Sequence, residues 1–458
     1  MSFRTACLAV LALIALSDGS RAPAADRPNI VVIMADDLGW MDLHCQGNER
    51  LDTPALDRLA AEGMRFTDAY AAAPVCSPTR AAMMTGQAPG RLGLTNHAPG
   101  NKDGFSLPNS NLREPPTERN LALSYVTIAE RLSAAGYATA HIGKWHLSHV
   151  ARSQKQAPLE PDLRPEHQGF DVNIGGCFRG GPPSYFAPYR IPALVDGEDG
   201  EYLPERLANE AIAYVRQNKD RRFFLSWWPY SVHYPMQARE ELIAKYRKRG
   251  GLKDPVYAAM IEAMDAGIGR FLRALDDAGL RDNTLVIFKS DNGGYNGDNR
   301  PLRGFKGMLF EGGIRIPWIV RWPGRVAPGT TCNTPVISMD CYPTLLEAAG
   351  LPPTPDHPVD GLSLLPLLEQ SGRLGRDAIF FHYPNYAFHK RNRLGGVIRE
   401  GSLKLIKRYR DDSLELYNLA ADIGERNNLA GRSPEVAARL ERRLETWLRD
   451  TGARMPVR

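Results

Sequence analysis

Short, continuous apolar runs recur along this 458-residue chain and alternate with stretches of helical pattern. Runs that do not alternate with polar residues are typical of strands buried on both faces of a parallel sheet. Helices between successive strands would then cover the two faces. We therefore expect an α/β fold built on a large, doubly wound, mostly parallel sheet. The expected strands are Asn29–Ala35, Thr139–Ile142, Phe223–Trp228, Thr284–Lys289 and Trp318–Trp322.

The pattern changes after about residue 351, where several prolines lie close together and indicate a connecting stretch. Beyond it, Val397–Arg399 and Leu403–Leu405 predict a hairpin, and an alternating run follows. We place a large domain at residues 25–375 and a smaller α+β subdomain, with an antiparallel sheet and a helix, at residues 376–458. The helix opens at Ser433-Pro434, and we expect it to pack on the small sheet through Val436, Leu440, Leu444 and Trp447.

Residues 1–24 have the layout of a secretory signal peptide. Arg4 precedes an apolar run from Ala6 to Leu16, and small residues offer a cleavage point after Ala24. The run is little more than half of the roughly 20 apolar residues that a membrane-spanning helix needs. No later segment is long and apolar enough to span a bilayer. We therefore expect a secreted or periplasmic protein without a membrane span.

The charge balance restricts the class of binding partner. With 57 basic and 52 acidic residues the formal charge is +5, and the basic residues are scattered. This distribution is compatible with an anionic substrate and gives no support for nucleic-acid binding.

Six cysteines include Cys7 in the expected signal peptide, and the odd remainder suggests one thiol with another task. No spacing indicates a zinc site. A local bridge between Cys332 and Cys341 depends on geometry, and pairing that includes Cys45 and Cys177 stays open.

Two acidic strand ends indicate a cation site. Asp36 and Asp37 directly follow the first expected strand, where ligands bind in open α/β sheets. Adjacent like charges are costly there unless a cation or hydrogen bonds compensate them. An Asp-Asp pair alone is more often a cap or a turn. The second acidic strand end, Asp291-Asn292, favours a hard cation held by oxygen.

The segment from Cys76 to Arg80 predicts a helix N-terminus, with Pro78 as an early helical residue. A helix N-terminus presents unpaired N–H groups and the positive end of the dipole, so it is an anion site. Arg80 would lie one turn beyond residue 76. The simpler alternative, on local features alone, is a buried free cysteine beside a helix cap.

Cys76-Ser77-Pro78-Thr79-Arg80, followed by Thr85-Gly86, resembles the Cys-x-Pro-x-Arg signature of the type I sulfatase family, within the alkaline phosphatase-like superfamily. The resemblance implies a sulfuric ester hydrolase similar to arylsulfatase and N-acetylgalactosamine sulfatase-type enzymes, with residues 25–375 as its catalytic domain. It also implies that a formylglycine-generating enzyme oxidises Cys76 to formylglycine. Four further blocks resemble the family in its order: Pro28–Asp37, Gly136–His146, Ser290–Gly313 and Leu416–Leu429.

Carried over position by position, the resemblance implies one calcium ion and a modified nucleophile. A carboxylate-rich oxygen set also suits calcium better than zinc. Hydrated as an aldehyde, residue 76 would offer one hydroxyl that attacks sulfur and another that later expels sulfate. Arg80 would hold and polarise the modified residue. The implied calcium ligands are Asp36, Asp37, Asp291, Asn292 and the modified residue 76.

The same resemblance assigns two lysines and two histidines. Lys144 would bridge nucleophile and sulfate, and His146 would act as base on the formylglycine hydroxyl, work that imidazole suits. His233 would protonate the leaving alkoxide, and Lys306 would bind sulfate. Without the family, His146 could equally be a packed surface histidine and Lys306 an exposed turn residue.

We expect a sulfated carbohydrate substrate, with galactose- or N-acetylgalactosamine-type sulfates as the leading class. Charged and amide groups around a cleft favour a hydroxyl-rich sugar over a simple aryl group. Besides Lys144, His233 and Lys306, the expected substrate-binding residues lie in loops of the type that line clefts. These are Arg179, Asp298, Asn299, Arg300 and His382. Trp227, Trp228, Tyr185 and Phe186 could stack on a sugar or an aryl ring.

Three alternatives stay open. The enzyme could act on small aryl sulfates, or it could be a formylglycine-dependent hydrolase of phosphonates or phosphate esters. It could also be a sulfated-glycan-binding protein that has kept the fold and lost catalysis. Loss of a motif residue would have favoured the last alternative, and none of Cys76, Arg80, Lys144, His146, His233 and Lys306 is missing.

Overall fold

The computed structural model describes residues 27–149, 163–389 and 391–458. Its main element is an eight-stranded sheet with the order β5-β4-β6-β1-β7-β8-β2-β9. The strands from β5 to β7 pair in parallel, whereas β8 runs antiparallel to β7. In sheet order the bounds are Val172–Ile174, Ala138–Gly143, Phe223–Trp228, Asn29–Ala35, Thr284–Ser290, Trp318–Arg321, Met64–Phe66 and Thr330–Cys332.

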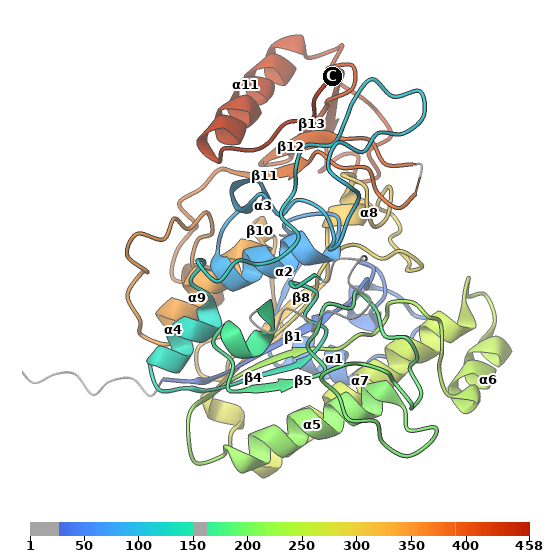
Figure 1. The fold of residues 1–458 in the computed structure, drawn as a ribbon, viewed down its shortest axis with the longest axis vertical. Coiled ribbons are helices and arrows are strands. Elements are labelled where there is room, and N and C mark those ends of the chain that lie inside the picture. Colours follow the sequence, from blue (N-terminus) through green and yellow to red (C-terminus); the bar gives the residue numbers. More distant parts are fainter. Residues whose placement is uncertain (1–26, 150–162, 390) are drawn as a thin grey trace, which may run out of the picture.

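Helices cover both faces of this sheet (Figure 1). The continuous apolar sequence of β1 explains the two layers, because Val31 and Ile33 pack into one core and Ile30 and Val32 into the other. The first core includes α1 (Pro54–Ala61), α5 (Leu203–Gln217), α6 (Glu240–Arg249) and α7 (Pro255–Asp277). The second includes α2 (Cys76–Thr85), α3 (Pro89–Leu92), α4 (Ile128–Ala134), α9 (Cys341–Ala348) and α10 (Leu365–Leu368).

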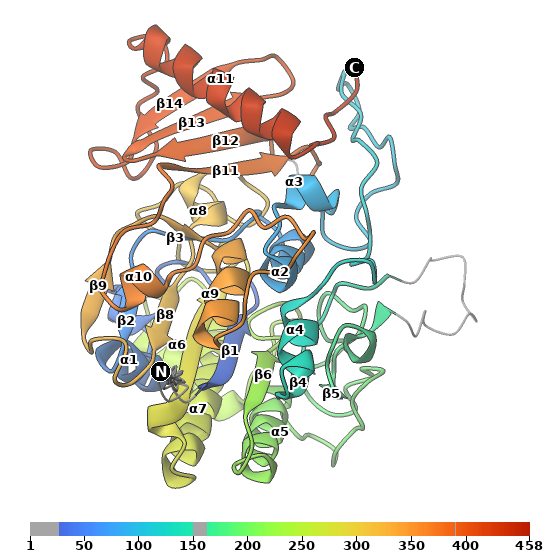
Figure 2. The same cartoon turned by 90° about the vertical axis from the view of Figure 1, so that its left-hand side faces the viewer.

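A second sheet follows near the C-terminus and lies beyond one edge of the large domain (Figure 2). Its strands are antiparallel in the order β11 (Ala378–Tyr383), β12 (Gly395–Glu400), β13 (Leu403–Arg408) and β14 (Leu414–Asn418). Helix α11 (Pro434–Asp450) packs on it through Leu440 and Leu444. A two-stranded sheet of β3 (Ala69–Tyr70) and β10 (Val336–Ile337), and the short α8 (Glu311–Ile314), lie between the two parts.

The predicted fold class is confirmed, including the small antiparallel sheet and its helix. The expected strands Asn29–Ala35 and Phe223–Trp228 have the same bounds as β1 and β6. The division at residues 375 and 376 stays a prediction. The expected signal peptide lies outside the described residues. Among the residues that are described, no helix combines the length and the apolar character needed to cross a membrane.

The cysteines do not form the local bridge that the sequence left open. Cys332 and Cys341 are both free thiols, as are the other three described cysteines, Cys45, Cys76 and Cys177. Cys332 ends β9, whereas Cys341 is buried at the start of α9. The described fold therefore depends on its apolar cores rather than on disulfides.

Candidate active site

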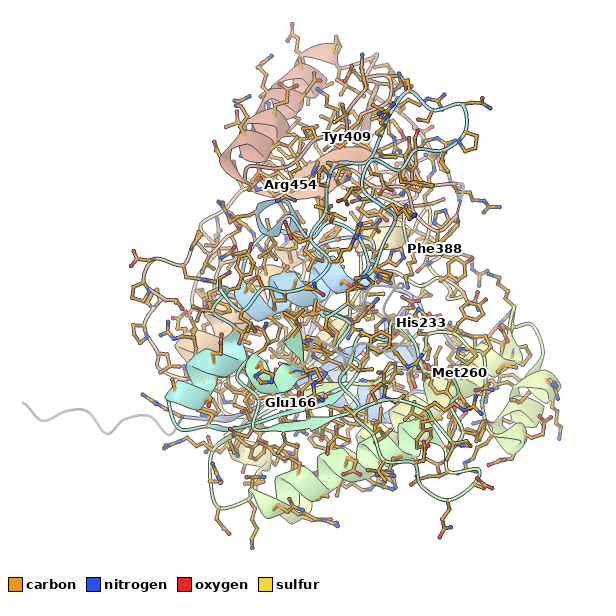
Figure 3. The ribbon with its side chains drawn as sticks, in the orientation of Figure 1. Glu166, His233, Met260, Phe388, Tyr409 and Arg454 are labelled. Carbon is orange, nitrogen blue, oxygen red and sulfur yellow. The ribbon has the colours of Figure 1, made fainter. Side chains whose placement is uncertain are left out.

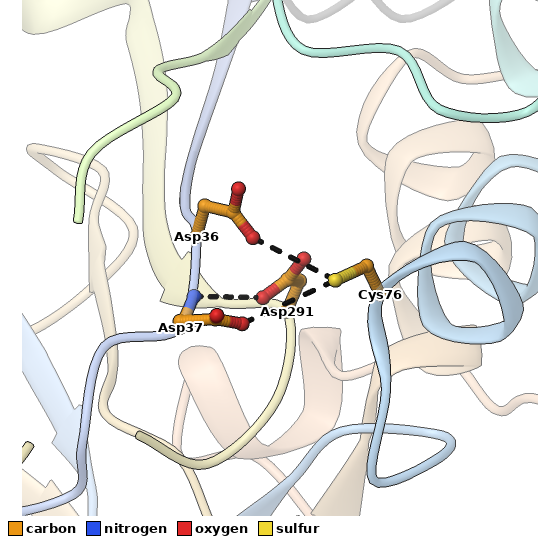
Figure 4. Close-up of side chains that lie close together, drawn as sticks. All are labelled: Asp36, Asp37, Cys76 and Asp291. Atoms are coloured by element: carbon orange, nitrogen blue, oxygen red, sulfur yellow. Dashed lines mark hydrogen bonds between the residues drawn. The ribbon is translucent and has the colours of Figure 1, made fainter. Parts of the chain in front are cut away.

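The carboxyl ends of β1 and β7 lie side by side because the two strands pair in parallel. Asp36 and Asp37 follow β1, and Asp291 follows β7. Cys76 begins α2 and approaches these carboxylates from another direction (Figure 4). One possible ligand atom from each of the four residues lies within 4.8 Å of the others. Two strand ends and one helix start therefore converge on a single cluster.

Asn292 adds an amide to this cluster and leaves one oxygen unsatisfied. Its Nδ2 donates to Asp37 Oδ1 at 2.7 Å, whereas its buried Oδ1 has no hydrogen-bond partner. Such an orphaned carbonyl oxygen is costly. Burial raises the pKa of Asp36 to about 8 despite the nearby Lys144 ammonium. Carboxylate and amide oxygens with one unsatisfied atom fit a hard cation such as calcium.

Arg80 and Lys144 hold two of the carboxylates, those of Asp291 and Asp36, by hydrogen bonds. The Nε and Nη2 atoms of Arg80 donate to Asp291 Oδ2 at 3.0 and 2.8 Å. Its Nη1 donates to the Lys144 carbonyl at 2.9 Å. The Lys144 Nζ lies 2.8 and 2.7 Å from the two oxygens of Asp36. All of these side chains are fully buried, where charges require partners.

Cys76 lies at the start of α2 with its side chain buried. Its Sγ is 3.7 Å from Asp36 Oδ1 and 4.0 Å from Asp37 Oδ1. Burial raises the pKa of the thiol to about 12, although Lys144 and Lys306 oppose that shift. The thiol is therefore protonated at neutral pH and is a weak nucleophile in this form. The predicted helix with Pro78 in its first turn is confirmed.

His146 occupies a constrained position beside the start of α2. It has a left-handed φ of 59°, which is uncommon for a residue other than glycine. Its Nε2 lies 2.6 Å from the Ala98 carbonyl, and its buried Nδ1 has no partner. Because a carbonyl can only accept, Nε2 carries the proton and Nδ1 keeps a lone pair. Burial holds the pKa of His146 well below its usual value, so the neutral imidazole can accept a proton.

His233 and Lys306 meet at Asp37. The Lys306 Nζ donates to Asp37 Oδ2 at 2.7 Å, and His233 Nε2 lies 3.7 Å from the same carboxylate. Burial, with Lys306 nearby, lowers the pKa of His233 to about 3. The imidazole is therefore neutral beside the lysine, and a bound anion would favour its protonation.

A cavity of about 650 Å³ opens onto this cluster. Two residues of its wall, His233 and Phe388, lie on the side of the molecule where the large domain meets the C-terminal part (Figure 3). The cavity joins cationic, carboxylate and imidazole groups to an aromatic wall, which suits an anion attached to a ring. The lining residues are Asp37, Cys76, His97, Ala98, Pro99, His146, Phe178, Arg179, Gly180, Gly181, His233, Tyr234, Tyr295, Lys306 and Phe388.

Arg179 lines this cavity, but three other expected substrate-binding residues do not. Asp298, Asn299 and Arg300 line a separate cavity of about 450 Å³ that shares Tyr295 with the first. Asp298 and Arg300 pair with each other at 2.5 Å. The Asn299 amide donates to the Gly294 carbonyl at 3.0 Å. These three residues therefore lie beside the cavity over Cys76 rather than in its wall, and their role in substrate binding stays a prediction.

His382 does not lie in a loop as expected. It belongs to β11 and is buried, with Nδ1 2.7 Å from Tyr409 Oη and Nε2 3.1 Å from the Arg454 carbonyl. Tyr409 and Arg454 lie in the C-terminal part, away from His233 (Figure 3). The prediction was wrong because strand alternation turns this side chain into the interior. It does not line the cavity over Cys76.

The predicted aromatic stacking residues are also corrected. Tyr185, Trp227 and Trp228 are buried in the core, and Phe186 stacks on Tyr202 at 4.8 Å between ring centroids. Trp228 instead lies beneath Arg80, with 5.1 Å from the guanidinium carbon to the ring centroid. Trp227 and Trp228 belong to the buried strand β6, so their rings pack in the core and do not line a cleft. Four other rings line the cavity: Phe178, Tyr234, Tyr295 and Phe388.

Two of these four wall residues were within reach of the sequence analysis. Phe178 is adjacent to Arg179, and Tyr234 is adjacent to His233, so each of the two neighbours a predicted site residue. Phe388 and His97 lie in loops without a periodic pattern. His97 is held by its Nδ1, 3.0 Å from Asn96 Oδ1, and burial lowers its pKa to about 4. It therefore adds a neutral imidazole to the cavity wall.

Comparison with known families gives two matches along the chain. The family model described as "Sulfatase" matches residues 28–351. A second model, described as "N-sulphoglucosamine sulphohydrolase, C-terminal", matches residues 304–450. The first match spans most of the chain and includes all the residues of the cluster around Cys76.

Known proteins with similar sequences carry related names. The chain is 33% identical to human arylsulfatase A over 94% of its length and 89% of that protein. It is 32% identical to a protein named sulfatase from Formosa agariphila, over 94% and 90% of the two chains. It is 34% identical to human N-acetylgalactosamine-6-sulfatase, over 78% and 69%.

Solved structures with a similar fold include a protein named Ps i-CgsB. The structure named Ps i-CgsB superposes with a TM-score of 0.79 at 28% identity, covering 93% of each chain. The same protein has been solved in complex with k-i-k-neocarrahexaose, with the same similarity to this chain.

Proposed function

This chain belongs to the sulfatase family and is a sulfuric ester hydrolase, and we propose that it acts on a sulfated saccharide through formylglycine at residue 76 and one calcium ion. The observation that carries the proposal is the convergence of Asp36, Asp37, Asp291 and Cys76 on one cluster at the floor of a cavity. A bound cation beside an anion pocket would stabilise the negative charge that develops on the sulfate during hydrolysis of the ester.

Calcium would be held by Asp36, Asp37, Asp291, Asn292 and residue 76. The orphaned Oδ1 of Asn292 and the crowded carboxylates support this set. When bound, the ion would supply positive charge that orients residue 76 and stabilises charge developing on the sulfate.

Formylglycine would supply a hydrated aldehyde with two hydroxyls, one for attack at sulfur and one for the later release of sulfate. The protonated, buried thiol of Cys76 would not perform this work in its unmodified form. Arg80, which bonds both Asp291 and the Lys144 carbonyl, would hold the modified side chain in place. The formylglycine-generating enzyme would be the partner that modifies Cys76.

The four other residues would divide binding and proton transfer. Lys144 and Lys306 would contact the sulfate, because each ammonium bonds a carboxylate of the cluster and Lys306 also lines the cavity. The unprotonated Nδ1 of His146 would take the proton of the residue-76 hydroxyl. His233, once protonated beside the bound anion, would donate a proton to the leaving alkoxide. Arg179 would contact the saccharide at the cavity wall.

A saccharide fits the cavity better than a small aryl ring. Its volume of about 650 Å³ exceeds what one aryl sulfate fills, and its wall combines four aromatic rings with Arg179 and His97. A solved relative at 28% identity has been crystallised in complex with k-i-k-neocarrahexaose, and a relative at 34% identity is named N-acetylgalactosamine-6-sulfatase. Galactose- or N-acetylgalactosamine-type sulfates stay the leading proposal.

The test is sulfate release from a panel of saccharides with one sulfate at a defined position, next to an aryl sulfate and matched phosphate and phosphonate esters. We expect a sulfated saccharide to give the highest kcat/KM. Hydrolysis of aryl sulfates alone would rule out the saccharide. Preference for a phosphate ester would favour the phosphohydrolase alternative. Binding of sulfated glycans without turnover, by protein whose residue 76 is fully modified, would favour the non-catalytic alternative.

A further inference from the structure

Arg179 is an unpaired cation in the wall of the cavity over Cys76. Lys306 and Asp37, the other two charged side chains of the wall besides Arg179, neutralise each other at 2.7 Å. The buried Nε of Arg179 has no hydrogen-bond partner. No ion pair joins its guanidinium to a carboxylate of residues 27–149, 163–389 or 391–458. A buried N–H without a partner is costly, so the Nε of Arg179 favours a ligand that accepts from the guanidinium.

The position of Arg179 is fixed by its neighbours in the chain. The guanidinium carbon lies 5.3 Å from the centroid of the Phe178 ring, a cation–π contact that limits its range. The two glycines that follow approach both active-site imidazoles. A Cβ built on Gly180 would lie 2.8 Å from His146 Cε1, and one built on Gly181 would lie 2.6 Å from His233 Nδ1. Arg179 therefore belongs to the segment that closes over the sulfate site.

We propose that Arg179 binds a second anionic group of the substrate, so that the preferred saccharide carries a carboxylate or a second sulfate besides the sulfate that is removed. This inference rests on the proposed function of the same cavity. The scissile sulfate would lie at Lys144, His233 and Lys306. The second anion, on the same sugar ring or the next, would then accept from Arg179.

The chemistry of the guanidinium supports an anion over a hydroxyl. A guanidinium presents parallel N–H donors that match the paired oxygens of carboxylate and sulfate. A neutral hydroxyl would accept one hydrogen bond and leave the positive charge uncompensated. The aromatic wall formed by Tyr234, Tyr295 and Phe388 can contact the sugar ring between the two anions.

The experiment uses three disaccharides that share one scissile sulfate. The first has a neutral neighbouring sugar, the second a uronate neighbour, and the third a second sulfate. We measure kcat/KM for the full chain, for Arg179→Gln and for Arg179→Lys. Arg442→Gln, on the outer helix α11, is the matched control. Thermal unfolding establishes that each variant is folded.

We expect the wild type to prefer one of the two dianionic substrates by about tenfold, which corresponds to about 1.4 kcal/mol. Arg179→Gln should remove that preference, so that its loss of kcat/KM is about tenfold larger on the preferred dianionic substrate than on the neutral-neighbour substrate. Arg179→Lys should keep part of it, because the charge remains while the paired donors are lost. The preferred substrate identifies the anion as carboxylate or sulfate.

Two results would overturn the inference while the sulfatase assignment stands. One is equal kcat/KM for all three disaccharides in the wild type. The other is an equal loss on all three in Arg179→Gln, which would assign the arginine to positioning of the loop. If aryl sulfates are hydrolysed and no disaccharide releases sulfate, the proposed saccharide function fails first, and the inference fails with it.

Discussion

Two glycines set how closely the cavity wall approaches the active-site histidines. Gly180 and Gly181 run against the imidazoles of His146 and His233, and a side chain at either position would enter the space of the ring. His146 cannot retreat freely because its Nε2 is held 2.6 Å from the Ala98 carbonyl. A displacement of about 1 Å at a proton-transfer group can cost on the order of 100-fold in rate.

We therefore expect Gly181→Ala to lower kcat/KM by about 10- to 100-fold on any accepted sulfate ester. Its new Cβ would lie 2.6 Å from His233 Nδ1 and 2.8 Å from the Tyr234 carbonyl. The loss should appear mainly in kcat, with a small change in melting temperature. Gly375→Ala is the control, since a Cβ there meets nothing within 4 Å. Unchanged kcat in Gly181→Ala would contradict the role of this glycine in setting the position of His233.

The unsatisfied oxygen of Asn292 supports a prediction about the metal. Removing calcium with a chelator should abolish turnover and lower the melting temperature, and calcium should restore both, because ligand binding to the native state stabilises it. Asn292→Ala should weaken calcium affinity by about 10-fold or more in calorimetric titration, since it deletes the orphaned oxygen. Asn427→Ala, at an exposed site, should bind as the wild type does. Turnover that persists after complete removal of divalent metal would contradict the calcium site.

The cluster was predictable from the sequence because parallel neighbours end at the same edge of a sheet. Asp36 and Asp291 each follow a run too apolar to be exposed, and that pattern places them together. The cavity wall was not predictable in the same way. Tyr295 and Phe388 come from loops, whose course depends on tertiary contacts rather than on periodicity. His382 was misplaced because a β-strand alternates its side chains between two faces, and its face points inward.

At the scale of the elements, the long strands were predicted well and the short ones were missed. β1 and β6 are apolar throughout, so their bounds follow from composition. β2, β5 and β9 have three residues each, too few to give a periodic signal. They extend the sheet at its edges and do not carry the residues of the cluster. The functional part of the sheet is therefore the part that the sequence predicts best.

A buried charge network joins β13 to α8 and to Glu425, in the loop between β14 and α11. The Lys404 Nζ lies 2.8 Å from Glu311 and 2.8 Å from Glu425, and all three side chains are fully buried. Glu425 Oε2 in turn accepts from the Glu311 N–H at 2.7 Å, at the start of α8. Lys404 therefore pairs with two carboxylates between the small sheet and the large domain, and Arg315 pairs with Glu311 as well, at 3.3 Å.

We expect Lys404→Met to lower the free energy of unfolding by about 3–5 kcal/mol, because it leaves buried Glu425 without its cation and Glu311 with Arg315 alone. Adding Glu425→Gln should recover part of the loss, since one uncompensated charge is removed. Lys407→Met on the same strand is the matched control. Lys407 pairs with Glu441 and Glu445 near the surface, so its loss should be about 1 kcal/mol or less. Urea unfolding measures all three, and equal losses for the two lysine variants would contradict the network's role.

At the scale of the whole molecule, several buried histidines are kept neutral away from the cluster around Cys76. Burial lowers the pKa of His141 to about 3, and aromatic rings of Trp145, Phe170 and Trp228 surround its imidazole. Burial likewise lowers the pKa of His382 to about 4. An unfolded histidine titrates near pH 6.5. Between pH 6.5 and about 4 the unfolded chain therefore binds protons that the native protein does not, and native stability falls as the pH falls.

Asp265 contributes a pH dependence of stability with the opposite sign to that of the histidines. Its buried carboxylate accepts from the N–H groups of Ala55 and Leu56 at the start of α1, and burial raises its pKa to about 7. The native state then holds a proton that the unfolded state releases above its lower pKa, so this group destabilises the native state as the pH rises towards 7. The total pH dependence of stability is therefore a sum of opposing contributions, and a single histidine must be isolated by difference.

We predict that His382→Gln makes the protein less sensitive to acid. The free energy of unfolding of the wild type, minus that of the variant, should decrease by about 1.4 kcal/mol for each unit that the pH falls between pH 6.5 and about 4. The slope is the test, because lost bonds to Tyr409 and Arg454 lower the variant's stability by an amount that does not depend on pH in this window. Urea unfolding at pH 7.0, 6.0, 5.0 and 4.5 measures it. His44→Gln, at an exposed position, should follow the wild-type curve. Parallel curves for His382→Gln and wild type would show that His382 takes up its proton in the native state as readily as in the unfolded chain.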